Sequence, residues 1–115
     1  MLNIAVLVSG GGTNLQALLD SEARGENPNG KITLVVASKP GVYALERAAK
    51  AGVEGVVVRR KDYATSEAFD AALLKTLKEH DIDLVVLAGF LSVLGPSVIE
   101  AYPRRILNTV SYTHL

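Results

Sequence analysis

Three consecutive glycines, Gly10 to Gly12, are the feature with the clearest chemical meaning in this chain of 115 residues. They lie between a short apolar run, Ile4 to Val8, and the pair Thr13-Asn14, which precedes a segment with helical periodicity. Glycine has no Cβ atom, so the backbone can turn sharply and an anion can approach its amides. The first N–H groups of the following helix lack intrahelical partners and carry the positive end of the helix dipole. The loop therefore predicts a phosphate site at the first N–H groups of the helix, with the Thr13 hydroxyl and the Asn14 amide as further donors; a tight turn capped by Thr13 or Asn14 is the structural alternative.

The named nucleotide-binding motifs do not account for this loop. A dinucleotide fingerprint that begins at Gly10 requires glycine where Leu15 stands, and no Lys-Ser/Thr pair follows as in a P-loop. We therefore expect a compact phosphomonoester at this loop and not a dinucleotide.

Two later segments could line the same site. Gly89 to Gly95 is an uncharged, mainly apolar loop after a buried run. It can form one wall of a pocket for a flat, partly apolar group, or it can simply cover the core. Asn108 ends an expected fifth strand, and its neutral amide can donate to a developing oxyanion. A lone asparagine at a strand end is also a common turn residue.

The remaining polar residues have structural interpretations. Lys75, Lys78 and His80 complement the dipole at the end of an expected helix. The run Arg59-Arg60-Lys61 is expected to be solvated, with steering of an anionic ligand as the alternative. No Ser/His/Asp or paired-carboxylate constellation is present, and no metal site is expected because the chain has no cysteine and its two histidines, His80 and His114, lack ligand spacing.

Strands and helices are expected to alternate along the chain. The strand-length runs rich in Val, Ile and Leu are Ile4 to Val8, Ile32 to Ala37, Gly55 to Val58 and Ile82 to Ala88, followed by a fifth at Arg105 to Asn108. Their nearly continuous hydrophobicity is typical of parallel strands covered on both faces. The helical segments between them have apolar faces formed by Leu15, Leu18 and Leu19, by Leu45, Ala48 and Ala49, and by Phe69, Leu73 and Leu77 after a Ser66 N-cap; a short helix begins near Pro96. We predict a doubly wound, Rossmann-like α/β fold with helices on both faces, whose ligands bind beyond the carboxyl ends of the strands.

Composition restricts the class of protein. The 12 Lys and Arg residues balance 12 Asp and Glu residues, and 49% of the chain is hydrophobic. This composition fits one globular domain and excludes intrinsic disorder. It also argues against a dedicated nucleic-acid binder or a basic membrane-surface protein. The uncharged stretch Leu84 to Ile99 is too short for a membrane helix, and the first residues do not resemble a signal peptide, so we expect a cytoplasmic protein.

Four motifs, in this order, resemble the phosphoribosylglycinamide formyltransferases, the glycinamide ribonucleotide transformylases of purine synthesis. They are Ser9-Gly10-Gly11-Gly12-Thr13-Asn14-Leu15-Gln16, Leu45-Glu46-Arg47-Ala48 before Ala51-Gly52-Val53, Val85-Val86-Leu87-Ala88-Gly89-Phe90, and Arg105-Ile106-Leu107-Asn108. The resemblance covers residues 1–108, roughly the N-terminal half of that family's usual chain. We expect a domain cut after its fifth strand, with residues 109–115 as a tail foreign to the family.

The resemblance implies transfer of a formyl group from the cosubstrate 10-formyltetrahydrofolate to the amine of glycinamide ribonucleotide, without a metal. It implies that Gly12, Thr13 and Asn14 hold the ribose phosphate. The segment Leu91, Ser92, Val93 and Leu94 would embrace the folate pteridine. Asn108 would polarise the formyl carbonyl and so contact both the folate and the reacting atoms.

Two departures bear on activity. Ser66 and Ser92 stand where basic side chains are common in the family, so no charged folate contact is expected from these two side chains. Val110 occupies the place of a histidine that works with a later aspartate in proton transfer, and His114 is four residues too late to replace it. We therefore expect the 115-residue chain alone to be inactive. The alternatives are a non-catalytic module that binds phosphate ligands and a gene fragment without a function of its own; oligomeric state is left open.

Overall fold

The computed structural model describes residues 2–10, 12–25, 29–90 and 94–109 of the chain. Strands and helices alternate as the sequence predicts. The elements are β1 (Leu2–Val8), α1 (Thr13–Ala23), β2 (Gly30–Ala37), α2 (Tyr43–Lys50), β3 (Glu54–Val57), the 3-10 turn η1 (Arg60–Asp62), α3 (Ser66–Glu79), β4 (Leu84–Ala88), α4 (Pro96–Ala101) and β5 (Ile106–Thr109).

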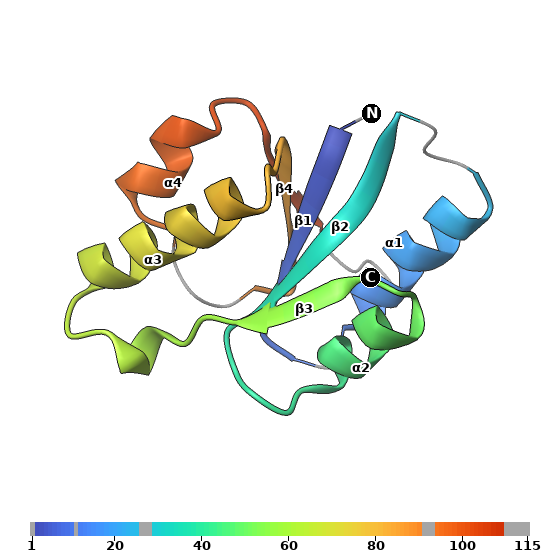
Figure 1. Cartoon of the computed structure of the whole chain (residues 1–115), viewed down its shortest axis with the longest axis horizontal. Helices are drawn as coiled ribbons and strands as arrows, with labels where there is room; N and C mark the ends of the chain where they lie inside the picture. The colour runs from blue at the N-terminus through green and yellow to red at the C-terminus, as the bar shows by residue number, and fades with distance from the viewer. Residues whose placement is uncertain (1, 11, 26–28, 91–93, 110–115) are drawn as a thin grey trace, which may run out of the picture.

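The strands form one parallel sheet in the order β3-β2-β1-β4-β5. Helices α1 and α2 cover one face of this sheet and α3 and α4 cover the other (Figure 1). The strand order reverses between β1 and β4, because the chain adds β2 and β3 on one side of β1 and then crosses to the other side. This doubly wound arrangement confirms the predicted fold class, and it places the ligand-binding edge at the loops that follow β1 and β4.

The core is divided between the two faces of the sheet, because successive strand residues point to opposite sides. In β1, Ile4, Val6 and Val8 are buried beneath α1 and α2. Ala5 and Leu7 are buried on the opposite face, where they share a cluster with the side chains of α3 and α4. The long apolar run in β1 is therefore explained by burial on both faces.

Several local expectations are wrong. The predicted strand Gly55 to Val58 is not covered on both faces, because Gly55 and Val57 of β3 are exposed, Val57 by 40%. Ala49 is exposed, and Ala44 takes the buried position on α2. The N-cap of α3 is Thr65 and not Ser66; the Thr65 hydroxyl accepts the N–H of Ala68 at 3.1 Å.

Candidate functional site at the carboxyl edge of the sheet

The loop after β1 is shaped by Gly12. This residue has φ of 81° and is the N-cap of α1. A Cβ atom placed on it would lie 2.8 Å from Ala44 Cβ and 3.0 Å from Ala44 Cα in α2. Gly10 differs, because a Cβ there would meet no atom within 4 Å. Gly12 is therefore required by both its backbone conformation and its close approach to α2, whereas Gly10 tolerates a side chain.

The N-terminus of α1 presents donors at this loop. The first intrahelical hydrogen bond runs from the Gln16 N–H to the Gly12 carbonyl at 2.8 Å, so the N–H groups of Thr13, Asn14 and Leu15 precede the helical ladder. The first turn of α1 contains no acidic residue that would compensate the positive end of the helix dipole. Thr13 and Asn14 lie inside the helix and no side chain caps it, so the alternative in which either one caps the turn is wrong.

The loop after β4 is held at both of its described ends. Gly89 turns the chain with φ of 71°, and the half-buried side chains of Phe90 and Leu94 pack against the cluster beneath α3 and α4. Predicted pocket residues Leu91, Ser92 and Val93 lie outside the described residues, so of that segment only Leu94 is placed.

Asp70 fixes the end of this loop, a role that sequence reasoning missed. Its carboxylate is 2% exposed and accepts the N–H of Gly95 at 3.0 Å and the N–H of Ser97 at 2.8 Å. These two amides belong to the start of α4, where a negative charge also complements the helix dipole. The available signal was an aspartate directly beside the apolar row of Phe69 and Leu73, but its partners are 25 and 27 residues away.

Asn108 lies at the same edge, two strands from the glycine loop. It is exposed on β5, opposite Leu87 of β4. Ile106, two residues earlier, packs into the cluster beneath α3 and α4, so alternation assigns Asn108 to that face of the sheet. The parallel sheet thus brings Gly12, the loop after β4 and Asn108 to one edge, although they are far apart in the sequence.

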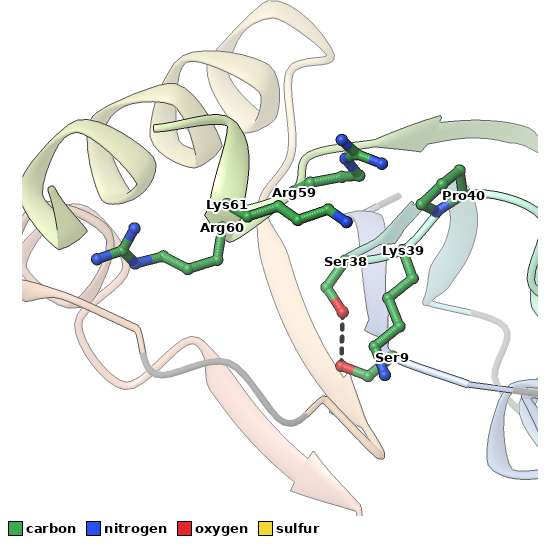
Figure 2. A pocket seen from close by; sticks show the side chains of 7 residues that line it. All are labelled: Ser9, Ser38, Lys39, Pro40, Arg59, Arg60 and Lys61. Carbon is green, nitrogen blue, oxygen red and sulfur yellow. Dashed lines mark hydrogen bonds between the residues drawn. The ribbon is translucent and has the colours of Figure 1, made fainter. Parts of the chain in front are cut away.

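A cavity of about 630 Å³ lies beside the glycine loop, and Ser9 is the one described residue of that loop that lines it. Its lining residues come from the ends of β1, β2 and β3; they are Ser9, Ser38, Lys39, Pro40, Arg59, Arg60 and Lys61 (Figure 2). The run Arg59 to Lys61 is solvent-accessible as predicted, but it also forms one wall of this cavity. Sequence reasoning missed that wall, because nothing in the run itself indicates what lies opposite.

One cation of the cavity is already neutralised. The Arg59 guanidinium bonds the Asp62 carboxylate at 2.8 Å, and this contact raises the pKa of Arg59 and lowers the pKa of Asp62. The Arg59 side chain is 31% exposed and the Asp62 side chain 51%, so solvent screens the pair and it adds little to stability. The pair does reduce the positive charge that the cavity offers to a ligand, because the Arg59 guanidinium already has an anionic partner.

Neither a metal site nor a membrane span is found in the parts of the chain that the structure describes. No three His, Asp or Glu side chains among those residues are grouped so that they could hold a metal ion. Within the same residues, no helix has the length and apolar character needed to cross a bilayer.

Comparison with known proteins identifies the family to which this chain is similar. Residues 2–110 match the sequence profile described as "Formyl transferase". The phosphoribosylglycinamide formyltransferase of Haemophilus influenzae is 38% identical over 108 residues, which are 94% of this chain and 50% of that protein. The trifunctional purine biosynthetic protein adenosine-3 of Homo sapiens is 39% identical over 105 residues, 91% of this chain and 10% of that protein.

Solved structures show the same similarity. The crystal structure of glycinamide ribonucleotide transformylase 1 from Symbiobacterium toebii superposes with a TM-score of 0.89 at 42% identity, over 94% of this chain and 50% of that one. The enzyme of that name from Geobacillus kaustophilus also gives a TM-score of 0.89, at 40% identity, over 94% of this chain and 57% of that one. The chain thus spans about half the length of the bacterial proteins that it matches.

Proposed function

This chain belongs to the formyl transferase family, and from that premise we propose that it is the substrate-binding, N-terminal half of a phosphoribosylglycinamide formyltransferase. The whole protein would transfer a formyl group from 10-formyltetrahydrofolate to the amine of glycinamide ribonucleotide in purine synthesis. The observation that carries the proposal is the match of residues 2–110 to the family, together with relatives of that name that are more than 35% identical.

The phosphate of glycinamide ribonucleotide would bind at the start of α1. Gly12 lets the loop pack closely on α2 at the start of the helix, and the N–H groups and side chains of Thr13 and Asn14 would donate to the phosphate oxygens. The absence of an acidic residue in the first turn of α1 supports this assignment, because a carboxylate there would repel the substrate.

Asn108 would act at the reacting carbonyl. When the substrate amine attacks the formyl carbon, a C–N bond forms and the carbonyl oxygen gains negative charge, which the Asn108 amide can stabilise by donating a hydrogen bond. The bond from the formyl carbon to the folate nitrogen then breaks, and a proton passes from the attacking amine to the leaving nitrogen. Leu91 to Leu94 would hold the folate ring beside this point.

Proton transfer is the step for which this chain lacks a residue. The family's histidine would stand at position 110, where the sequence has valine, and the family's later aspartate has no counterpart in residues 1–115. The chain by itself would therefore bind the phosphate substrate without appreciable turnover.

Two measurements test this proposal. Calorimetry should show that the 115-residue chain binds glycinamide ribonucleotide in preference to unrelated sugar phosphates, and the purified chain should give no formyl transfer above background. In a full-length protein that contains this segment, Asn108→Ala should lower kcat by about 10²- to 10³-fold, the effect of removing one oxyanion donor. Appreciable turnover by the 115-residue chain, or an Asn108→Ala protein with unchanged kcat, would contradict the assigned roles. Equal binding of every sugar phosphate would favour a general phosphate-binding module.

A further inference from the structure

The floor of the cavity defined above is a pair of buried serines. Ser9 and Ser38 are 4% and 9% exposed, and the Ser38 hydroxyl donates to the Ser9 oxygen at 2.8 Å. Each serine continues an apolar row on the face covered by α3 and α4: Leu7 precedes Ser9 by two residues, and Val36 precedes Ser38 by two. Two hydroxyls therefore replace apolar side chains where the core ends and the cavity begins.

The walls of the cavity carry an excess of positive charge. Lys39 comes from the loop after β2, and Arg60 and Lys61 come from η1 after β3. Among the described residues, no acidic side chain lines the cavity, and neither Lys39 nor Lys61 has an ion-pair partner. Figure 2 shows Arg60 pointing away from the serine pair, whereas Lys39 and Lys61 extend past it from separate loops. The Arg60 guanidinium donates to the Tyr63 carbonyl at 3.0 Å, so the two lysines are the cations best placed for a ligand.

We propose that this cavity binds the phosphate group of a small phosphorylated molecule, at a site separate from the glycine loop. Lysine ammonium groups bind phosphate as point charges, and the Ser9–Ser38 pair adds polar oxygen atoms at the floor of the cavity. The volume of about 630 Å³ is within the range of small-molecule sites, so it accommodates an organic group as well as the phosphate, with Pro40 as an apolar wall.

Gly12 and the floor of the cavity belong to opposite faces of the sheet. Gly12 packs on Ala44 of α2, on the face covered by α1 and α2. The rows that lead to Ser9 and Ser38 belong to the face covered by α3 and α4. Among the described residues, the cavity and the start of α1 have no lining residue in common, so the cavity is proposed as a second site, independent of the formyl-transfer proposal.

Nuclear magnetic resonance locates binding residue by residue in the 115-residue chain. An ¹⁵N-labelled sample is titrated with inorganic phosphate, with ribose 5-phosphate and, as a polycarboxylate, with citrate. Both phosphate compounds should shift the amide signals of Ser38, Lys39 and Lys61 and bind more tightly than citrate. These shifts should persist in Thr13→Val, which alters only the glycine-loop site.

Substitutions test whether the cavity itself holds the ligand. Lys39→Gln and Lys61→Gln should each raise the dissociation constant, measured from the Ser38 and Lys39 signals, about fivefold. This is the effect of removing one charge at about 4 Å in a water-exposed site. Lys31→Gln, an exposed lysine at the start of β2, is the matched control and should leave the dissociation constant unchanged.

Four results would overturn the proposal. They are shifts confined to Thr13 and Asn14, citrate binding as tight as ribose 5-phosphate, unchanged affinity in the Lys39→Gln and Lys61→Gln variants, and an equal loss in Lys31→Gln. The amide spectrum of each unliganded variant reports whether it is folded, so a lost site is distinguished from a lost fold. A failed formyl-transfer assay would leave these results unaffected.

Discussion

Replacement of Gly12 by alanine tests the geometry of the glycine loop most directly. The new side chain has two separate costs. An L-residue at φ of 81° is strained by about 1 kcal/mol. A Cβ atom 2.8 Å from Ala44 Cβ and 3.0 Å from Ala44 Cα forces the backbone of α2 to move, which costs about 1–3 kcal/mol more. We therefore expect Gly12→Ala to lower the free energy of unfolding by about 2–4 kcal/mol.

Two other glycines separate these contributions. Gly52, at the end of α2, has φ of 75° but open space around its Cα, so Gly52→Ala carries the conformational strain alone, about 1 kcal/mol. Gly10 has neither a left-handed φ nor a neighbour within 4 Å, so Gly10→Ala should be nearly neutral, about 0.5 kcal/mol or less.

Urea denaturation of the four proteins, followed by far-ultraviolet circular dichroism, provides the comparison. The chain has no tryptophan, so fluorescence is less suitable. A total stability in the usual range of about 5–15 kcal/mol leaves Gly12→Ala measurable. If Gly12→Ala costs no more than Gly52→Ala, the loop does not pack rigidly on α2. If Gly10→Ala costs as much as Gly12→Ala, the glycines do not have the different roles described above.

Three further predictions concern contacts away from the glycine loop. Asp70→Ala should lower the free energy of unfolding by about 2 kcal/mol, because two amides at the start of α4 lose their acceptor, and Asp70→Asn should cost about half as much; equal losses in urea denaturation would contradict this reasoning. The Thr76 carbonyl and then the Glu54 carboxylate raise the pKa of His80, so its stabilising effect should be complete below its ordinary value near 6.5 and disappear as pH rises through the higher folded-state value. Unfolding measured from pH 5.5 to 8.5 should show this fall in the wild type and a flatter profile in His80→Gln; parallel profiles would refute it. Thr65→Ala should cost about 1 kcal/mol in thermal or urea unfolding and Ser66→Ala much less, whereas the reverse order would restore Ser66 as the N-cap.

The correct expectations from sequence depend on local patterns. Continuous apolar runs predicted the central strands, because burial on both faces requires apolar residues at successive positions. Three glycines between a strand and a helix predicted the loop at Gly12, because a left-handed residue in close contact with a neighbour excludes a side chain. The N-cap of α3 was misplaced by one residue, since Thr65 and Ser66 are both good caps and only the observed bond to Ala68 distinguishes them.

The sequence by itself determined the α/β class, the family resemblance, and the candidate residues Gly12, Thr13, Asn14 and Asn108, because each is encoded within a short segment. The tertiary structure alone decided that β3 is an exposed edge strand, that Asp70 anchors α4, and that Ser9 and Ser38 form the floor of one cavity with Lys39 and Lys61. The physical reason is that neighbours in a parallel sheet are set by strand order and crossover direction. Side chains from segments far apart in the sequence then lie at one edge of the sheet, and no local sequence pattern indicates that they do.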